Sequence, residues 1–460
     1  MVNLLKFIMG ILRHLRNGLS SWIRTENIQD FWRCRLQKCS FRKCLILWML
    51  VTVFAASAEL APISVICVDA EATGYATFQS HNQKVVANTR GIFLTYLRSR
   101  NEDYTAQEWR LMHSKDQGAT FLTLFQGVHA TNPPVLESDS KDNLYLIRSD
   151  FVGGDAYLYR FMADKDYVNP AITVLPKGAA GKYAMVVDEV RNRLYYMAHN
   201  GCFFRLDLDG NLLYKGRILV DGPNAALQYP SLCNDNGGRL FLAWTTVKHH
   251  EYLYWDIHAM KSEDQGQSWR ALSGDSISIP SVSDDTGMTT RISLDDEFIS
   301  HTWLSNMLEH GGKLHFFYLA RTSPLRQHYI RYDVESGREE VRIRPSFTGD
   351  HLRIESLDGF FASTDGDGPL FCVGAHEGRI VCLVSKDNGT TWHAHARSED
   401  VFKIYAIGGC RRVTENGDII GTFTDFRTSE SNEPHSKVFF FRIPAFSSKD
   451  DVNSQETEAK

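Results

Sequence analysis

Features of several protein classes are missing from this 460-residue sequence. Glycine and proline occur at ordinary levels, with 33 and 13 residues, and 43% of the residues are hydrophobic. These values exclude a collagen-like chain, a disordered chain and a polytopic membrane protein. Fifty Lys and Arg residues against 55 Asp and Glu residues give a formal net charge of −5, so a nucleic-acid partner is not expected.

Cysteine pairs with metal-binding or redox spacing are also absent. None of the nine cysteines belongs to a CxxC motif, so neither a zinc ribbon nor a redox dithiol is expected. Cys372 and Cys382 could face each other across a hairpin, although two separate buried thiols are the favoured interpretation. The run His249-His250-Glu251 has metal-binding residue types at a poor spacing. We therefore predict no metal and no cofactor.

The first part of the chain differs in charge from the rest. Residues 1–43 hold nine Lys or Arg residues against two acidic ones, and residues 44–58 then carry no charge and end in small residues. This order is typical of a secretory signal. Because residues 60–68 are also mostly apolar, a retained anchor is the alternative, and a buried helix of the domain is a third. We predict a basic leader at 1–43, a signal or anchor helix at 44–68 and an extracytoplasmic location for the rest, with no other membrane contact.

A polar turn followed by an aliphatic and aromatic strand recurs seven times in the remaining sequence. The spacings are mostly close to the roughly 40–50 residues of a four-stranded propeller blade, and no long helical periodicity interrupts them. The pattern predicts an all-β, seven-bladed β-propeller over residues 75–446, with six blades as the alternative and a polar disordered tail at 447–460. The seven strands are expected to begin at Ile92, Leu144, Leu194, Leu240, Leu314, Leu370 and Ile419.

A second phrase of eight residues, Ser-x-Asp-x-Gly-x-Thr/Ser-aromatic, occurs three times, starting at Ser114, Ser262 and Ser385. In each copy the Asp can accept hydrogen bonds from turn N–H groups, the Gly supplies a positive φ, and the aromatic residue can pack into the sheet. The phrase is similar to the Asp-box of the sialidase superfamily, a resemblance that covers residues 75–445. It implies a propeller directed at glycans. Because the box is a structural turn in that superfamily, we assign it no catalytic role.

The residues with which sialidases bind a substrate carboxylate are only partly matched. Their first arginine lies in a Phe/Tyr-Arg-Ile-Pro phrase at the start of the propeller, whereas Phe441-Arg442-Ile443-Pro444 lies at the end of this chain. We interpret this phrase as a closing strand, with a displaced carboxylate clamp as the alternative. A sialidase-like glycoside hydrolase is therefore the second hypothesis.

A closer resemblance is to the BNR-repeat propellers that include ulvan-type polysaccharide lyases. His129, Asn132 and Pro133 are similar to the His-Asn-Asn-Pro phrase of those proteins. Tyr229-Pro230 is similar to their Tyr-Pro pair, and a further His-Asn pair occurs at His199-Asn200. The resemblance implies a polysaccharide as the ligand.

β-Elimination across a uronate explains why such residues would be needed. The weakly acidic C5 proton must pass to a base, a cation must neutralise the carboxylate, and a donor must protonate the leaving oxygen. The resemblance implies His129 or His199 as the base and Tyr229 as the acid. The arginine that follows the Tyr-Pro pair in that family is missing here, and Arg321 is the replacement that we expect one blade later.

Four further residues are expected to contact a glycan. Trp303 lies in an insertion of the middle blade, and long loops on a rigid scaffold often form a binding face, although burial as a core aromatic is an equal alternative. We predict a monomeric, glycan-directed propeller that leans toward a uronate-polysaccharide lyase, with a non-catalytic carbohydrate- or protein-binding propeller as the third hypothesis. The four binding residues are Asn132, Asn200, Trp303 and His328.

Overall fold

The computed structural model describes residues 60–446, apart from residues 80, 99–106, 152, 180, 285–289, 294–300, 322–325, 344–346, 357 and 427–434. The predicted leader at 1–43, most of the predicted signal or anchor segment and the tail at 447–460 lie outside the described residues. Within the described part, no helix has the length and apolar character needed to cross a membrane. Residues 64–68, which the sequence placed at the end of the signal or anchor segment, lie in a strand of the fold.

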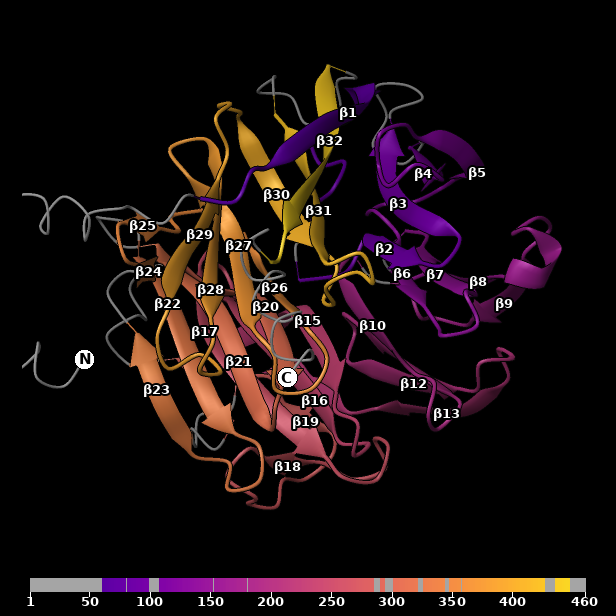
Figure 1. The fold of residues 1–460 in the computed structure, drawn as a ribbon. Helices are drawn as coiled ribbons and strands as arrows, with labels where there is room; N and C mark the ends of the chain where they lie inside the picture. The colour runs from indigo at the N-terminus through magenta and orange to yellow at the C-terminus, as the bar shows by residue number, and fades with distance from the viewer. Residues whose placement is uncertain are drawn as a thin grey trace, which may run out of the picture. The chain divides into compact units, whose positions relative to one another are not determined.

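The described residues form an all-β fold of small antiparallel sheets, which confirms the predicted class (Figure 1). Five of the described sheets have four strands each, and successive strands pair with one another. They comprise β6 (Val135–Ser138), β7 (Leu144–Ser149), β8 (Ala156–Phe161) and β9 (Ala171–Leu175); β10 (Tyr183–Asp188), β11 (Arg193–Ala198), β12 (Cys202–Leu206) and β13 (Leu212–Arg217); β15 (Ala225–Asn234), β16 (Leu240–Lys248), β17 (Tyr254–Ser262) and β18 (Arg270–Ala271); β20 (His301–His310), β21 (Lys313–Arg321), β22 (Arg326–Asp333) and β23 (Glu339–Ile343); and β26 (Phe360–Ser363), β27 (Leu370–His376), β28 (Arg379–Ser385) and β29 (His393–Arg397).

An eight-stranded sheet joins the two ends of the described chain. One half of it holds β2 (Val85–Asn88), β3 (Gly91–Arg98), β4 (Glu108–Ser114) and β5 (Leu122–Val128). The other half holds β30 (Ile404–Gly409), β31 (Asp418–Asp425), β32 (Ser436–Pro444) and β1 (Ser64–Ala72). β1 pairs with β32 along its length but with β3 only at Ala72 and Arg98. Two-stranded sheets are formed by β14 (Leu219–Val220) with β19 (Ser281–Val282) and by β24 (Thr348–Gly349) with β25 (Leu352–Arg353).

The first strands of these four-stranded groups lie around a common centre, as in a β-propeller (Figure 1). Each contacts the first strand of the next group, in the order β2, β6, β10, β15, β20, β26 and β30, and β2 also contacts β31. The strands that the repeated phrase predicted are the second members of the groups, namely β3, β7, β11, β16, β21, β27 and β31. The phrase Phe441-Arg442-Ile443-Pro444 lies in β32, between β31 and β1.

Buried apolar side chains fill the spaces between neighbouring sheets. Tyr145 and Ile147 of β7 pack with Tyr183 and Met185 of β10, and equivalent clusters lie between the other sheets. Each large side chain buried in this way contributes about 1.5–3 kcal/mol, so the sheets are held mainly by their faces. Successive residues of a strand face the two neighbouring sheets in turn, which explains why both faces of the strand are apolar.

Cys372 and Cys382 are two separate thiols. Cys372 pairs with Leu383 and Cys382 pairs with Val373, so the two side chains point to opposite faces of the hairpin formed by β27 and β28. They accordingly belong to different apolar clusters, and both are free.

The three Ser-x-Asp phrases form turns between the third and fourth strands of their groups and share one hydrogen-bond pattern. In the copy at residues 262–269, Gly266 N donates to Ser262 Oγ over 2.8 Å, and Ser268 N donates to Asp264 Oδ1 over 2.8 Å. The glycine has a φ of 82°, and Trp269 is buried at the end of the turn. Although burial acts in the opposite direction, hydrogen bonds from Ser268 and Ser262 lower the pKa of Asp264.

Replacement of Asp264 by Ala is expected to lower the free energy of unfolding by about 1–3 kcal/mol, because several turn donors lose their acceptor. Urea unfolding followed by tryptophan fluorescence measures this loss. Asp209→Ala is the matched control, since Asp209 lies in an exposed turn and should change stability by no more than about 0.5 kcal/mol. Since the lowered pKa stabilises the ionised form in the fold, the difference between wild type and Asp264→Ala should shrink as the pH falls toward the acidic range. Equal stability of the two variants would contradict a structural role for the turn.

Candidate functional site

Aromatic and basic side chains from several groups meet where the first strands begin, and we call this set the mouth cluster. Its members come from the segment before β2, from the start of β10, from the end of β11, from the bulge of β15, and from the starts of β17, β20 and β30. They are Tyr75, Phe78, His81, Lys182, His199, Tyr229, Tyr252, Tyr254, His301, Trp303 and Tyr405. The three Ser-x-Asp turns follow the ends of third strands, which run parallel to the first strands, so they lie at the opposite rim.

Tyr229 is held in a strained backbone conformation at the centre of the mouth cluster. It lies at a bulge of β15, where the register shifts between Gln228 and Ser231, and its φ is 44°. A non-glycine residue in this region costs on the order of 1–3 kcal/mol, and such strain is common at functional sites. The bulge turns the Tyr229 ring toward Phe78 and His81, with ring centroids 6.0 and 5.7 Å away.

The hydroxyl of Tyr229 lies 2.9 Å from that of Tyr254. Burial and the neighbouring Tyr254 raise the pKa of Tyr229 above its usual value. The phenol therefore keeps its proton at neutral pH and can donate it, but cannot serve as a ready base.

Lys182 supplies a positive charge beside Tyr229. Its Nζ lies 4.7 Å from the centroid of the Tyr229 ring and donates to Gln228 Oε1 over 2.5 Å. Burial lowers the pKa of Lys182 to about 8, so the ammonium form still predominates at neutral pH. An ammonium that is partly stripped of water attracts a carboxylate more strongly than an exposed one does.

Two imidazoles lie close enough to this lysine to be affected by its charge. Burial and the charges of Lys84 and Lys182 lower the pKa of His81, and burial and Lys182 lower that of His199. Both rings are therefore neutral at neutral pH and can accept a proton. Nε2 of His199 lies 2.6 Å from the carbonyl of Leu227, which places the His199 proton on Nε2 and its lone pair on Nδ1.

Polar contacts between loops fix this arrangement. The side chains of Gln79 and Asn132 both donate to the carbonyl of Gly181, directly before Lys182. Below them, Nζ of Lys84 donates to the carbonyl of Asn82 over 3.0 Å. Burial lowers the pKa of Lys84 to about 7, against the opposing charge of Asp358.

Aromatic rings extend the cluster to both sides. Tyr405 stacks on Phe78 with an interplanar angle of 2° and a centroid distance of 6.2 Å. On the other side, Trp303 meets the edge of Tyr254 at 5.3 Å, and the backbone N–H of Tyr254 donates to Nδ1 of His301 over 3.2 Å. Flat apolar rings of this kind match the faces of sugar rings in size and polarity.

The structure brings some of the sequence-predicted residues together. His199, Tyr229 and Trp303 belong to the mouth cluster, and Asn132 lies next to it through its bond to Gly181. The backbone of Arg321 pairs with His301 of the cluster, so its position in β21 is adjacent.

Other predicted residues lie apart from the mouth cluster. His129 is exposed after β5, with a φ of 63°, and its carbonyl accepts a hydrogen bond from Arg148. Asn200, in the turn between β11 and β12, donates to the carbonyl of Lys177 and accepts from the backbone N–H of Cys202. His328 is buried within β22 and stacks on Tyr318. Arg442 contacts Gln117 and Asp418 at the opposite rim.

Several members of the mouth cluster were not identified from the sequence. His81 is followed by Asn82, so it carries the same His-Asn pair that pointed to His199, and this signal could have found it. Lys182, Tyr254 and Tyr405 belong to no recognisable phrase, because strands distant in sequence bring them together. In the described part of the chain, no group of three or more His, Cys, Asp and Glu side chains is placed to hold a metal ion.

The described fold is one that polysaccharide lyases also have. The structure of an ulvan lyase of polysaccharide lyase family PL25, bound to -[GlcA(1-4)Rha3S]-, is similar with a TM-score of 0.58 at 11% identity, over 82% of this chain and 95% of the lyase. The polysaccharide lyase Uly1 is similar with a TM-score of 0.52 at 10% identity, over 84% of this chain and all 100% of Uly1. No protein-family model and no curated protein matches the sequence. At these identities the likeness establishes the fold.

Proposed function

We propose that this protein is an exported, seven-bladed propeller that cleaves a uronate-containing polysaccharide by β-elimination at the mouth cluster. The observation that supports it most is the meeting of a neutral imidazole, a protonated phenol and an ammonium group around Tyr229. These are the base, acid and cation that the reaction needs. The shared fold with lyases of ulvan supports a polysaccharide that contains uronate as the substrate class.

In the proposed reaction, Lys182 binds the uronate carboxylate and makes the C5 proton more acidic. His81 takes this proton, the electrons of the C5–H bond form the C4–C5 double bond, and the C4–O bond breaks. Tyr229 protonates the leaving oxygen, and solvent then returns the His81 proton to Tyr229. We assign the base to His81 because its ring contacts that of Tyr229, at a centroid distance of 5.7 Å.

This assignment changes two roles that the sequence suggested. Lys182 takes the place of Arg321 as the carboxylate partner, and His81 takes the place of His129 and His199 as the base. His129 lies exposed after an outer strand, where its contacts are with Arg148 rather than with the cluster. His199 then packs against Gln228, the residue whose Oε1 accepts a hydrogen bond from Lys182.

The direct test is to mix the secreted protein with uronate polysaccharides, ulvan among them, and to follow the absorbance of the unsaturated uronate. Release of products with this absorbance is expected. Cleavage of a sialoside reporter would instead favour a hydrolase. Retention on the polysaccharide without cleavage would favour a binding propeller, an alternative for which the exposed Tyr252 at the mouth provides a suitable sugar-stacking surface.

Activity is expected to fall as the pH rises through about 8, because Lys182 then loses its charge and the bound carboxylate loses its partner. Lys182→Arg should keep the charge and remove this alkaline limb, whereas Lys182→Met should lower kcat/KM about 10- to 100-fold at neutral pH. The measurement is kcat/KM across the neutral and alkaline range. Lys215→Arg is the matched control, since Lys215 also lies over an aromatic ring but on β13. An alkaline limb that persists in Lys182→Arg would contradict the assignment.

A further inference from the structure

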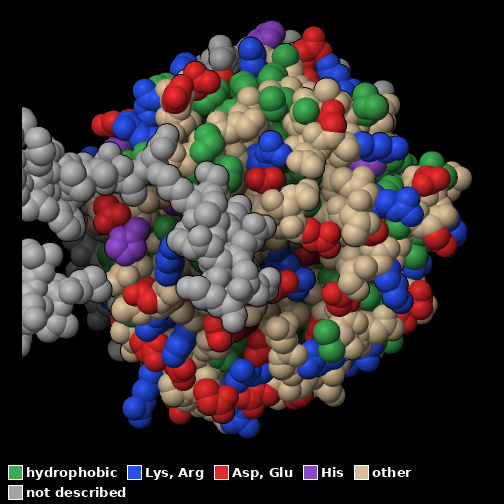
Figure 2. Space-filling view, viewed as in Figure 1, with side chains coloured by type: hydrophobic (Ala, Val, Ile, Leu, Met, Phe, Trp, Pro, Cys, Tyr) green, Lys and Arg blue, Asp and Glu red, His purple; other side chains and the backbone are tan. Residues whose placement is uncertain are grey.

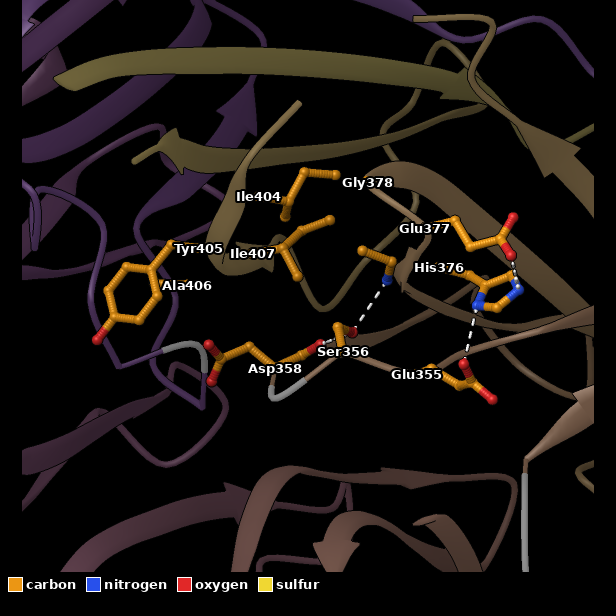
Figure 3. Close-up of a pocket in the computed structure, with 11 residues that line it drawn as sticks. Glu355, Ser356, Asp358, His376, Glu377, Gly378, Ile404, Tyr405, Ala406 and Ile407 are labelled. Carbon is orange, nitrogen blue, oxygen red and sulfur yellow. Dashed lines mark hydrogen bonds and ion pairs between the residues drawn. The ribbon is translucent and has the colours of Figure 1, made fainter. Parts of the chain in front are cut away.

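A cavity of about 240 Å³ opens beside the mouth cluster, between the segment before β26, the end of β27 and the start of β30 (Figure 3). Tyr405 forms one of its walls and is also the ring that stacks on Phe78 of the cluster. Asp358 lines the same cavity, and its negative charge raises the pKa of Lys84 against the effect of burial. The cavity and the mouth cluster therefore share the Tyr405 side chain.

The acidic side chains of the cavity wall are Glu355, Asp358 and Glu377, and Ser356, His376 and Tyr405 add further polar groups. Figure 3 shows Asp358 on the side of Tyr405, and Glu355, His376 and Glu377 at the other end. Glu355 is held in place, with one oxygen 3.2 Å from Nδ1 of His376 and the other 2.9 Å from Nε of Arg353. Neither lysine nor arginine occurs among the described residues that line the cavity.

The remaining wall is apolar or backbone. Ile404, Ile407 and Ala375 supply aliphatic surface, and Ser356 Oγ accepts from the backbone N–H of Ala375. A sugar ring has both an apolar face and hydroxyl donors, so it fits an aromatic and aliphatic wall with carboxylate acceptors. A sulfate or a second carboxylate would instead meet the carboxylates of Asp358 and Glu377, with no lysine or arginine among the described lining residues. The charge of Glu355 is balanced by Arg353.

We infer that this cavity is the subsite for an uncharged sugar unit next to the uronate, so that the preferred substrate alternates uronate with unsulfated neutral sugar. The inference rests on the proposed function, because the uronate is placed at Lys182. It adds a selectivity against sulfate on the neighbouring unit. Figure 2 shows acidic and basic side chains interspersed over the part of the face that the described residues form.

The test compares chondroitin with chondroitin sulfate, two polymers of uronate and amino sugar that differ in sulfation. Binding is measured by the retardation of the protein in native gels that contain either polymer, and elimination is measured in parallel by absorbance. The wild type should bind chondroitin at least about tenfold more tightly than chondroitin sulfate. Glu377→Lys should narrow this ratio to about threefold or less, because it replaces a lining carboxylate with a cation. Glu399→Lys makes the same charge change outside the cavity and should leave the ratio unaltered.

Equal binding of both polymers by the wild type would overturn the inference, as would a ratio that Glu377→Lys and Glu399→Lys change alike. Failure of chondroitin to retard the wild-type protein would overturn it as well. Selective binding without elimination would count against the proposed reaction while leaving the subsite supported. Elimination of both polymers at equal kcat/KM would support the proposed reaction and count against the subsite.

Discussion

Tyr229→Phe is expected to lower the rate of elimination by about 10²–10⁴-fold, which is the usual contribution of a positioned acid. The substitution removes one hydroxyl and leaves the ring that packs against Phe78 and His81. Because the lost proton transfer occurs only in the transition state, kcat should fall while KM stays within about threefold. The measurement is a Michaelis–Menten series on a uronate polysaccharide, with product absorbance as the readout.

The matched control for this variant is Tyr214→Phe, which removes a phenolic hydroxyl on the outer strand β13 and should leave kcat within about twofold. A kcat of Tyr229→Phe close to that of the wild type would rule out Tyr229 as the acid. A rise in KM alone would place Tyr229 in binding rather than in proton transfer.

The same assay separates the two imidazoles. His81→Gln should lose activity about as strongly as Tyr229→Phe, whereas His199→Gln should lose less and should mainly raise KM through Gln228 and Lys182. The reverse order would move the base from His81 to His199.

Much of the fold follows from local sequence. The repeated phrase places a strand at each of the seven predicted positions, because a polar turn followed by alternating large apolar residues specifies a strand wherever it occurs. The Ser-x-Asp turns follow for the same reason, since all the groups that form one turn lie within eight residues. These strands and turns depend on residues that are close in the chain, so they can be predicted from the sequence.

The mouth cluster is different, because its geometry comes from strands far apart in sequence. Tyr229 and Trp303 could be singled out as residue types, but their link through Tyr254 depends on the packing of β15, β17 and β20. His129 was singled out because it belongs to a family-like phrase. It follows β5, the fourth strand of its group, and therefore lies toward the outer edge of that sheet. Lys182 gave no signal at all, since a single lysine before a strand usually points to solvent.

The contacts around Arg411 are another feature that only the structure reveals. Arg411 follows β30, and its guanidinium contacts Glu137 of β6 and the carbonyl of Leu232 in β15. Its backbone N–H donates to Oε1 of Gln83, just before β2, and the Gln83 amide donates to Glu137 over 3.0 Å. One residue thus links the first strands of groups that are distant in sequence.

Arg411→Met is expected to lower the free energy of unfolding by about 3–5 kcal/mol, because the buried Glu137 carboxylate then loses its ion-pair partner and keeps only the hydrogen bond from Gln83. Burial already raises the pKa of Glu137 against the opposing effect of Arg411, so removing the arginine should raise that pKa further. A carboxyl whose pKa is higher in the folded state costs stability as the pH rises above its unfolded pKa. The deficit of Arg411→Met should therefore be larger at about pH 8 than at about pH 5.

The double variant Arg411→Met/Glu137→Gln separates loss of the ion pair from loss of packing. It removes the stranded charge, so it should recover about half or more of the lost stability and should lose most of the pH dependence. Urea unfolding of the wild type, the two single variants and the double variant at both pH values completes the cycle. If the double variant is as unstable as Arg411→Met, and the deficit is the same at both pH values, the fold is held at this point by the packing of the Arg411 side chain rather than by its charge.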